Sequence, residues 1–354
     1  MIYRGDIMDP WPFYSAGAAA VPVGQYDADI ILLALDRVEE TEQAIASALA
    51  QAGGSWHLTI VDQGSSPANL LRLIAAVHGR TDATLFAPGG NLGVAGGRNL
   101  ASAAGHGRII VGLDNDAEFA DPSTVARALH ALDAEPDLAA IGFRIQVHAT
   151  GADDLTSWGY PSSLLAHAAG RFDATTFVGA GHAIRRKAWE DAGIYDPALF
   201  FCWEEFDFSL RAIALGWRIA YRGDIVVRHK VSAENRIAWS GQRWFYFVRN
   251  RLYIARKWST PWPALVPRAC AYLLKGFRHR MLGQTVRAML TAPKLSRGIT
   301  PRILPQAARD YLRRNDAAHR GNAFARLRTE ILARLPGAIL SRSSIGSNAG
   351  QSRK

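Results

Sequence analysis

The sequence predicts an α/β fold in which helices flank a mostly parallel sheet. From residue 28 onwards, short apolar runs alternate with stretches of helical spacing, an alternation typical of β-α-β units. Turn-forming residues such as Gln63-Gly64-Ser65-Ser66-Pro67 separate the segments, as expected between regular elements. Three of the apolar runs also end at or just before an aspartate, namely Asp36, Asp62 and Asp114. Ligands of such folds bind beyond the carboxyl ends of the strands, so these three positions mark the expected site.

The order of elements follows from the same patterns. Strands are expected at 29–35, 57–62, 84–86 and 108–113, and helices at 41–50, 69–77 and 100–104. Further along the chain we expect a helix to begin near residue 204, strand segments at 216–219 and 225–230, and an aromatic, basic helix to begin at 244. The domain organisation expected from composition is a loose leader (1–27), an α/β domain (28–255), a basic helical extension (256–340) and a disordered Ser/Gly/Asn-rich tail (341–354).

The composition excludes several classes of protein. With 354 residues and 49% hydrophobic residues, the chain can build a large core and is not globally disordered. Two cysteines cannot form a disulfide framework or a cysteine-rich zinc site. No run of 18 apolar residues predicts a membrane span, and the N-terminus lacks the pattern of a secretory signal. We therefore expect a cytoplasmic protein.

The net charge of +10 hides two parts of opposite sign. Residues 241–354 hold 23 Lys and Arg against 3 Asp and Glu, whereas residues 1–240 hold 18 against 28. The basic part is suited to an anionic surface, and its apolar run at 269–277 is too short to span a bilayer but is typical of an interfacial helix. We expect peripheral association with the inner face of the cell membrane. The alternative is an ordinary helix packed on the α/β domain.

Two motifs carry candidate chemistry. Asp114-Asn115-Asp116 follows an apolar strand, and its carboxylates can hold Mg²⁺ or Mn²⁺ and a ribose hydroxyl; the alternative is a plain acidic turn. The run from Gly89 to Asn99 is rich in glycine and contains Arg98, so it can approach a phosphate closely. Because it lacks the Lys-Ser/Thr of a P-loop, a flexible loop with a helix start is the alternative.

Taken in order, five motifs resemble the family 2 glycosyltransferases with the GT-A fold over about residues 28–255. They are Val61-Asp62-Gln63-Gly64-Ser65-Ser66, Asn91-Leu92-Gly93-Val94-Ala95-Gly96-Gly97-Arg98-Asn99, Asp114-Asn115-Asp116, Phe177-Val178-Gly179-Ala180-Gly181 and Trp203-Glu204-Glu205-Phe206-Asp207. The second motif is most similar to the rhamnosyl- and galactofuranosyl-transferring branch. The resemblance implies an inverting transfer from a UDP- or dTDP-sugar to a glycan or lipid-linked acceptor, with Mn²⁺ or Mg²⁺ as cofactor.

The resemblance also implies roles for single residues. Asp62 matches the carboxylate that pairs with the donor base, and Asp116 matches the metal ligand, with Asp114 on the ribose or metal side. Asp36 stands where many members have Asn, so it either contacts the donor or caps the helix that follows. The remaining residues expected to line the donor site are Gly93, Gly96, Arg98 and Asn115.

The second expected centre is the acidic motif. Glu205 matches the base that removes the proton of the acceptor hydroxyl, and Glu204 is the next candidate. Asp207 is expected to anchor the helix by pairing with Arg211 and is the last candidate base. The alternative is two acidic residues that complement a helix dipole. His229, which ends an apolar strand, matches a metal ligand in several members.

Other residues near these motifs have weaker signals. His182 lies where a sugar could pass but is equally consistent with a structural role. Trp158 and Trp203 are candidates for stacking on sugars or for packing, and Cys202 is interpreted as a packing residue.

Two other functions remain open at this point. One is a sugar nucleotidyltransferase, although the Gly-rich activation loop of such enzymes is missing from the leader. The other is a non-enzymatic nucleic-acid-binding protein that uses the basic part, although no recognised nucleic-acid motif is present.

Overall fold

The computed structural model describes residues 14–17, 21–22, 24–230 and 241–321. Most of the expected leader and the whole expected tail therefore lie outside the described residues. One described piece of the leader, β1 (Tyr14–Gly17), pairs with a strand of the main sheet and so is not loose.

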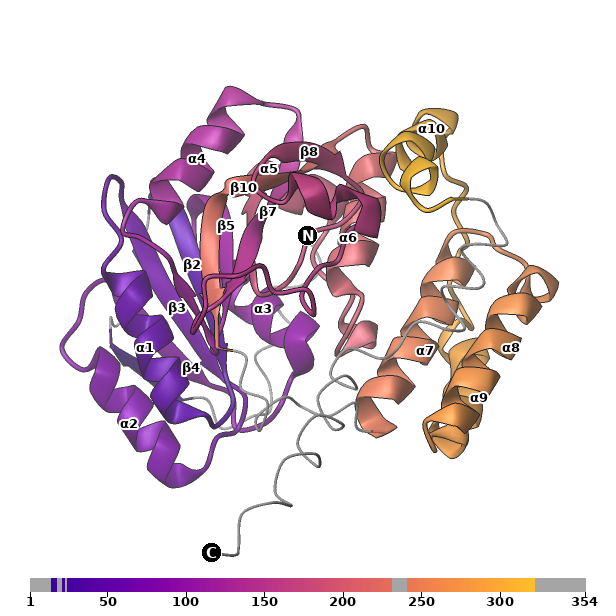
Figure 1. Cartoon of the computed structure of the whole chain (residues 1–354). Coiled ribbons are helices and arrows are strands. Elements are labelled where there is room, and N and C mark those ends of the chain that lie inside the picture. The colour runs from indigo at the N-terminus through magenta and orange to yellow at the C-terminus, as the bar shows by residue number, and fades with distance from the viewer. Residues whose placement is uncertain (1–13, 18–20, 23, 231–240, 322–354) are drawn as a thin grey trace, which may run out of the picture.

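A ten-stranded sheet forms the centre of the molecule (Figure 1). After β1, its strands in chain order are β2 (Tyr26–Ala34), β3 (Trp56–Asp62), β4 (Ala83–Ala87), β5 (Gly107–Asp114), β6 (Ala117–Phe119), β7 (Leu138–Val147), β8 (Arg171–Ala174), β9 (Gly181–Arg185) and β10 (Arg218–His229). Their spatial order is β1-β4-β3-β2-β5-β9-β7-β10-β6, and β8 pairs with β10.

The sheet is mixed rather than mostly parallel. Neighbouring strands from β4 through β3 and β2 to β5 are parallel, as the β-α-β pattern predicts. On the other side of β5, β9 runs antiparallel to both β5 and β7, and β10 is antiparallel to β6 and β8. Only the pairing of β7 with β10 is parallel in that half of the described sheet. Within 107–185, all of which the structure describes, no α-helix lies between β5 and β6 or among β7, β8 and β9, so the alternation from which the parallel sheet was predicted is interrupted in this half.

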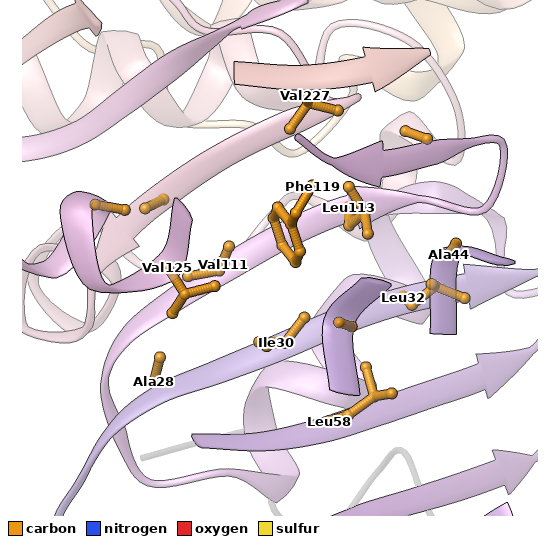
Figure 2. Packing of buried hydrophobic residues seen from close by; sticks show 14 of the residues in the cluster. Ala28, Ile30, Leu32, Ala44, Leu58, Val111, Leu113, Phe119, Val125 and Val227 are labelled. Atoms are coloured by element: carbon orange, nitrogen blue, oxygen red, sulfur yellow. The ribbon is translucent and has the colours of Figure 1, made fainter. Parts of the chain in front are cut away.

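Helices cover both faces of the sheet, which confirms the predicted α/β class. They are α1 (Val38–Leu49), α2 (Pro67–Val77), α3 (Gly93–Ala104), α4 (Thr124–Ala134), α5 (Arg186–Ala192), α6 (Glu204–Ala214), α7 (Gly241–Lys257), α8 (Trp262–Arg278), α9 (Leu282–Leu295) and α10 (Gln306–Asn315). Helices α1, α2 and α4 share one apolar core with the sheet, in which Ile30, Leu32 and Leu58 are fully buried (Figure 2). Helices α3, α5 and α6 share the core on the opposite face.

The basic extension consists of helices that pack beside this domain. Helices α7, α8 and α9 enclose a separate core around Trp244 and Tyr272, whereas α10 returns to the sheet (Figure 1). There the Tyr311 hydroxyl accepts a hydrogen bond from the Ile219 amide at 3.1 Å. Among the described residues, no helix has the length and hydropathy that a membrane span requires.

Candidate active site

The three aspartates predicted at strand ends lie at one edge of the sheet. Strand β2 runs between β3 and β5, and its register places Ala34 opposite Asp62 and Leu33 opposite Asp114. Asp36 follows β2 in the turn that leads to α1. The parallel half of the sheet therefore brings the first predicted residues together.

Asp36 and Asp62 both fix turns. The Asp62 carboxylate is 2% exposed and accepts the amides of Gly64 and Ser65 at 3.1 and 3.2 Å. Asp36 Oδ1 accepts from the Ser66 amide at 3.0 Å, at the start of α2. The backbone hydrogen bond from Ser66 holds the pKa of Asp36 below its usual range. The alternative that Asp36 caps the helix that follows it is wrong, because its side chain stabilises the neighbouring helix instead.

Arg98 lies at the centre of the site. Its guanidinium is buried and donates to Asp114 Oδ1 at 2.9 Å, to Glu205 Oε1 at 2.8 Å and to the Gly179 carbonyl at 2.8 Å. Burial of a charge without partners is costly, and these three acceptors satisfy the buried cation. Four of the five motifs that carried the resemblance thus meet at one side chain.

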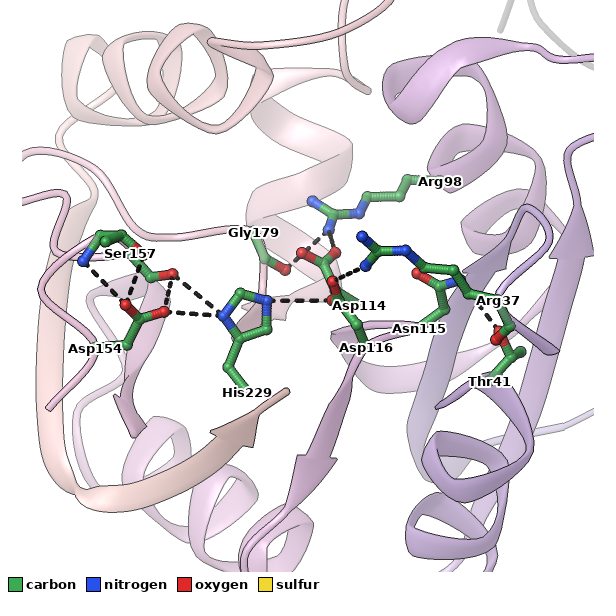
Figure 3. A network of polar contacts seen from close by, with 11 residues as sticks. Arg37, Thr41, Arg98, Asp114, Asn115, Asp116, Asp154, Ser157, Gly179 and His229 are labelled. Atoms are coloured by element: carbon green, nitrogen blue, oxygen red, sulfur yellow. Dashed lines mark hydrogen bonds and ion pairs between the residues drawn. The ribbon is translucent and has the colours of Figure 1, made fainter. Parts of the chain in front are cut away.

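A second cluster lies beside Asp114 (Figure 3). Asp116 Oδ1 lies 3.2 Å from His229 Nε2, and Asp116 Oδ2 accepts from Arg37 Nη1 at 2.5 Å. The backbone supports this proximity, because the Lys230 amide donates to the Asp116 carbonyl at 2.7 Å. Antiparallel pairing of β10 with β6 thus joins two residues that are 113 positions apart.

Asp154 orients the His229 ring from the other side. His229 Nδ1 lies 2.9 Å from Asp154 Oδ2, and the carboxylate also accepts from Thr156 and Ser157. Burial alone would raise the pKa of Asp154, but these hydrogen bonds outweigh it and hold the pKa well below the usual range. Because an ionised carboxylate only accepts hydrogen bonds, the proton between the two groups belongs to Nδ1. Nε2 therefore faces Asp116.

This donor set fits a divalent cation. A carboxylate behind a histidine, as Asp154 lies behind His229, is the usual outer partner of a metal-ligating imidazole. Adjacent ligands of an octahedral cation lie about 3 Å apart, close to the 3.2 Å between Asp116 Oδ1 and His229 Nε2. Among the described residues, no group of three or more His, Cys, Asp or Glu could hold a metal ion. The protein thus offers two ligands, and the predicted third, Asp114, is instead paired with Arg98.

The electrostatics of the cluster agree with that fit. Burial by itself would lower the pKa of His229, but hydrogen bonds with Asp116 and Asp154 raise it to about 10. Burial raises the pKa of Asp116, whereas His229 and Arg37 more than offset this and lower it. A cation bound at Nε2 would take the place of a proton, so the negative charge that attracts the proton also attracts the metal.

The acidic motif begins α6. Glu204 and Glu205 are its first two residues, but only Glu205 reaches solvent, with 15% of its side chain exposed. Glu204 is 3% exposed, and its Oε2 has no hydrogen-bond partner among the described residues. Burial raises the pKa of both carboxyls, and the charge of Glu205 adds to the effect on Glu204. A raised pKa suits a general base near neutral pH, and exposure favours Glu205.

Asp207 serves as an anchor, in agreement with the sequence interpretation. It is fully buried and accepts from Arg211 Nε at 3.1 Å, one helical turn away. Its other oxygen lies 2.8 Å from Lys257 Nζ at the end of α7. Asp207 therefore ties α6 to α7 and is not placed to receive a proton from a substrate.

The loop before α6 is strained and held by α7. Phe200, Cys202 and Trp203 have φ of +61°, +70° and +76°, values that cost free energy for residues other than glycine. Asn250 Nδ2 lies 2.8–2.9 Å from the carbonyls of Leu199, Phe201 and Cys202. This residue of α7 thus sets the conformation of the chain that delivers Glu204 and Glu205.

The glycine-rich run is a helix rather than an open loop. Helix α3 begins at Gly93, whose φ is +72° and where a Cβ would lie 2.3 Å from the Phe200 carbonyl oxygen. A Cβ on Gly97 would lie 1.9 Å from Gln63 Nε2, and one on Gly96 would lie 2.9 Å from Leu92 Cβ. Gly93 and Gly97 thus let α3 pack closely against Phe200 and Gln63, whereas the neighbour of Gly96 belongs to the start of the same helix. Contact between Gly93 or Gly96 and a phosphate, expected from the sequence, stays a prediction.

The weaker candidates have structural surroundings. His182 is fully buried, and burial lowers its pKa well below the usual range. Trp158 packs against Tyr160 and Tyr221 in an aromatic cluster. Trp203 donates to the Phe247 carbonyl at 3.0 Å, and burial raises the pKa of the Cys202 thiol. Asn115 donates to Thr41 Oγ1 at 3.1 Å, which fixes the turn between Asp114 and Asp116.

Sequence reasoning missed three residues of the site, namely Arg37, Asp154 and Asn250. Arg37 directly follows the predicted Asp36, and its positive φ of 46° turns the chain towards Asp116. Asp154 lies in a segment without periodicity, and its partner His229 is 75 residues away. Asn250 lies within the predicted aromatic, basic helix, in which the sequence singles out no site residue. The first of these had a local signal, whereas the other two depend on distant contacts.

Comparison with known proteins gives one family match and similar solved structures. Residues 29–193 match the model of glycosyl transferase family 2, and no curated protein sequence matches the chain. The fold is similar to a mannosyltransferase from Pyrobaculum calidifontis in complex with GDP-Man and Mn²⁺, with a TM-score of 0.54, 20% identity, and coverage of 93% of this chain and 88% of the other.

It is also similar to GalNAc-T7 with UDP, GalNAc and Mn²⁺, with a TM-score of 0.55 and 13% identity over 79% of this chain and 60% of the other. The match over residues 29–193 favours a glycosyltransferase over the nucleotidyltransferase and nucleic-acid-binding alternatives. Residues 29–193 therefore resemble glycosyl transferase family 2, and the chain shares its fold with solved glycosyltransferases.

Proposed function

We propose that this glycosyltransferase inverts the anomeric centre of a UDP- or dTDP-sugar as it transfers the sugar to a hydroxyl of a glycan or lipid-linked acceptor. The observation that carries the proposal is the position of Arg98, which contacts Asp114 on the donor side and Glu205 on the acceptor side. The buried guanidinium of Arg98 therefore fixes the distance between the donor side and the acceptor side of the site. Inverting transfer needs that arrangement, because the base and the leaving group act on opposite sides of one carbon.

On the donor side, Asp116 Oδ1 and His229 Nε2 would hold Mn²⁺ or Mg²⁺, with Mn²⁺ favoured by the imidazole ligand. When bound, the cation would neutralise charge on the diphosphate. Asp62 is proposed to contact the base, and Asp114, which is 40% exposed at the side chain, is proposed to contact the ribose. Asp154 orients His229, and Arg37 holds the second oxygen of Asp116.

On the acceptor side, Glu205 is proposed as the base. It takes the proton from the acceptor hydroxyl while the oxygen of that hydroxyl forms a bond to the anomeric carbon. The bond between this carbon and the diphosphate oxygen breaks, and the diphosphate leaves with the electron pair. Glu204 stays the second candidate, but its burial keeps it from the acceptor.

The finer assignment rests on the motif Asn91-Leu92-Gly93-Val94-Ala95-Gly96-Gly97-Arg98-Asn99. It supports transfer of a rhamnosyl or galactofuranosyl unit, and with it a role in cell-wall or polysaccharide biosynthesis. We place the enzyme in the cytoplasm, with peripheral association with the inner face of the cell membrane through its basic extension.

A panel of nucleotide sugars tests the proposal. The melting temperature of the full chain is measured with UDP-, dTDP- and GDP-sugars, each with Mn²⁺, with Mg²⁺ and with chelator. A donor at 100 times its Kd stabilises the folded state by about 2.7 kcal/mol, so a UDP- or dTDP-sugar should raise the melting temperature only when the cation is present. A shift given by GDP-sugars alone, or one unaffected by chelator, would contradict the proposed donor or the metal.

A further inference from the structure

Two helices of the basic extension present apolar side chains to solvent. On α8 these are Val266, Cys270, Leu274 and Phe277, and on α9 they are Leu282, Val286 and Leu290; we refer to these seven residues as the outer stripe. Phe277 and Leu290 are 73% and 65% exposed. Contiguous exposed apolar side chains are uncommon on soluble proteins and mark interaction surfaces.

The spacing shows that the outer stripe forms one face of each helix. Its positions on α8 are separated by four, four and three residues, and those on α9 by four and four, which is the repeat of one side of a helix. The opposite face of each helix is buried, around Tyr272 on α8 and Ala288 on α9. Helices α8 and α9 lie beside each other at the margin of the molecule away from the parallel strands (Figure 1).

The charge around the stripe has a single sign. No Asp or Glu occurs between residues 241 and 309, whereas this stretch holds 14 Lys and Arg. Arg278 and Lys294 are exposed, and they lie one position from Phe277 and one helical turn from Leu290. Arg287, next to Val286, is also exposed, and its guanidinium stacks over the Phe245 ring. An amphipathic helix with an apolar face flanked by basic residues is typical of attachment to anionic lipid.

We propose that the outer stripe of α8 and α9 is the surface by which the protein docks on an anionic bilayer. The seven apolar side chains would enter the boundary between headgroups and acyl chains, and the basic residues would contact lipid phosphates. This inference deepens the membrane association named under the proposed function, but it does not depend on sugar transfer. It also bears on that site, since α9 shares its core with α7, the helix whose Asn250 holds the acidic loop.

Charge argues against two other occupants of this surface. A second copy docked by the same face would bring two sets of basic residues together. The other candidate occupant is the C-terminal end of this chain. Its last 33 residues carry 6 Lys and Arg against 1 Glu, so their net positive charge would be repelled by the positively charged helices. An anionic lipid surface is the complementary partner.

The first experiment measures binding of the full chain to vesicles by sedimentation. Vesicles of phosphatidylglycerol and phosphatidylcholine are compared with vesicles of phosphatidylcholine alone. The double variant Phe277→Ser/Leu290→Ser changes only exposed side chains and keeps every charge. The matched control Leu71→Ser/Leu215→Ser removes two exposed leucines, 66% and 59% exposed, from α2 and the end of α6.

The proposal expects wild type and control to bind the anionic vesicles, and the stripe variant to bind at least about tenfold more weakly, since affinity scales with buried apolar area. The variant Arg278→Gln/Lys294→Gln should also bind more weakly and lose part of the salt dependence. Equal binding by the stripe variant and the wild type would overturn the proposal. A wild-type dimer in sedimentation equilibrium that the stripe variant converts to monomer would overturn it in favour of a second copy.

The native cysteines allow a direct test of depth. Cys270 is exposed on the stripe, whereas Cys202, the other cysteine, is only partly exposed and has a raised pKa, so a maleimide dye that reports polarity should label Cys270. The emission of the dye on Cys270 should shift to shorter wavelength when anionic vesicles are added. The same dye on Cys270→Ser/Leu71→Cys should show no shift, because it stays in water. No shift at Cys270 would overturn the proposal. Either result leaves donor binding and transfer, measured without vesicles, unaffected.

Discussion

Arg98 Nη1 donates to Glu205 Oε1 at 2.8 Å, although 107 residues separate the two in the chain. The same guanidinium donates to Asp114 Oδ1 at 2.9 Å. Because 4% of the Arg98 side chain and 15% of the Glu205 side chain are exposed, water screens this ion pair little, whereas the 40% exposed Asp114 is screened more. The contact joins α3, β5 and α6 and so couples the donor side of the site to the proposed base.

Removal of Arg98 should affect folding as well as catalysis. Arg98→Leu leaves Glu205 and Asp114 without their partner, and loss of one member of a buried pair costs about 3–5 kcal/mol; the exposure of Asp114 reduces its share. Arg98→Lys keeps the positive charge but loses the planar guanidinium that donates to several acceptors at once, so it should lower stability less. Thermal unfolding of both variants checks this order, and a stable Arg98→Leu protein would show that the pairs contribute little.

Replacement of Asp116 should abolish metal-dependent binding of the donor. Asp116→Asn removes the charge that the cation needs, while its position at a strand-end turn lets the fold persist. Titration with Mn²⁺ and a UDP-sugar measures this. Asp154→Asn should lower the affinity for the metal by about 10–100-fold. The change removes no ligand, because Asp154 only orients His229. Full metal affinity in Asp116→Asn would reject the assignment.

Asn250 should control turnover through the strained loop. Asn250→Ala removes the side-chain donor to the carbonyls of Phe201 and Cys202, at a cost of about 1–3 kcal/mol, whereas the Leu199 carbonyl keeps its hydrogen bond from Arg249. We expect kcat to fall while affinity for the donor alone stays near the wild-type value, since Asp116 and His229 are untouched. Separate measurements of kcat and donor Kd distinguish this from general destabilisation, which would lower kcat and also raise the apparent Kd of the donor.

Gly93 should tolerate no side chain. Gly93→Ala places a Cβ 2.3 Å from a backbone oxygen at a φ of +72°, so unfolding free energy should fall by more than about 1 kcal/mol. Gly283→Ala on α9 is the matched control, because nothing lies within 4 Å of its Cβ and alanine favours a helix. Equal melting temperatures for the two variants would mean that α3 can move away from Phe200.

The sequence predicted the half of the fold in which local pattern decides structure. Strands β2, β3 and β5 are continuous apolar runs, and each was expected within three residues of its observed ends. Helix α3 was expected only from residue 100, because glycine has a low helix propensity, yet close packing brings its start to Gly93. The segments 216–219 and 225–230 are one strand, β10, whose register shifts between Arg222 and Val226.

The site divides in the same way. Asp114, Asp116, Glu205 and His229 could be named because short motifs surround them. The contacts that set their properties come from Arg37, Asp154 and Asn250, which lie 48–79 residues from the groups they hold. The antiparallel pairing of β10 and the packing of α7 bring such partners together. These long-range contacts cannot be predicted from a local sequence pattern.

The central claim is that Glu205, and not its neighbour Glu204, receives the proton of the acceptor. The most direct test is a side-by-side measurement of kcat and donor Kd for Glu205→Gln and Glu204→Gln. Glu205→Gln should lower kcat by about 10²–10⁴ with donor Kd unchanged, and Glu204→Gln should lose much less. Exchanged phenotypes would make Glu204 the base, and full activity in both variants would show that the acidic pair is structural.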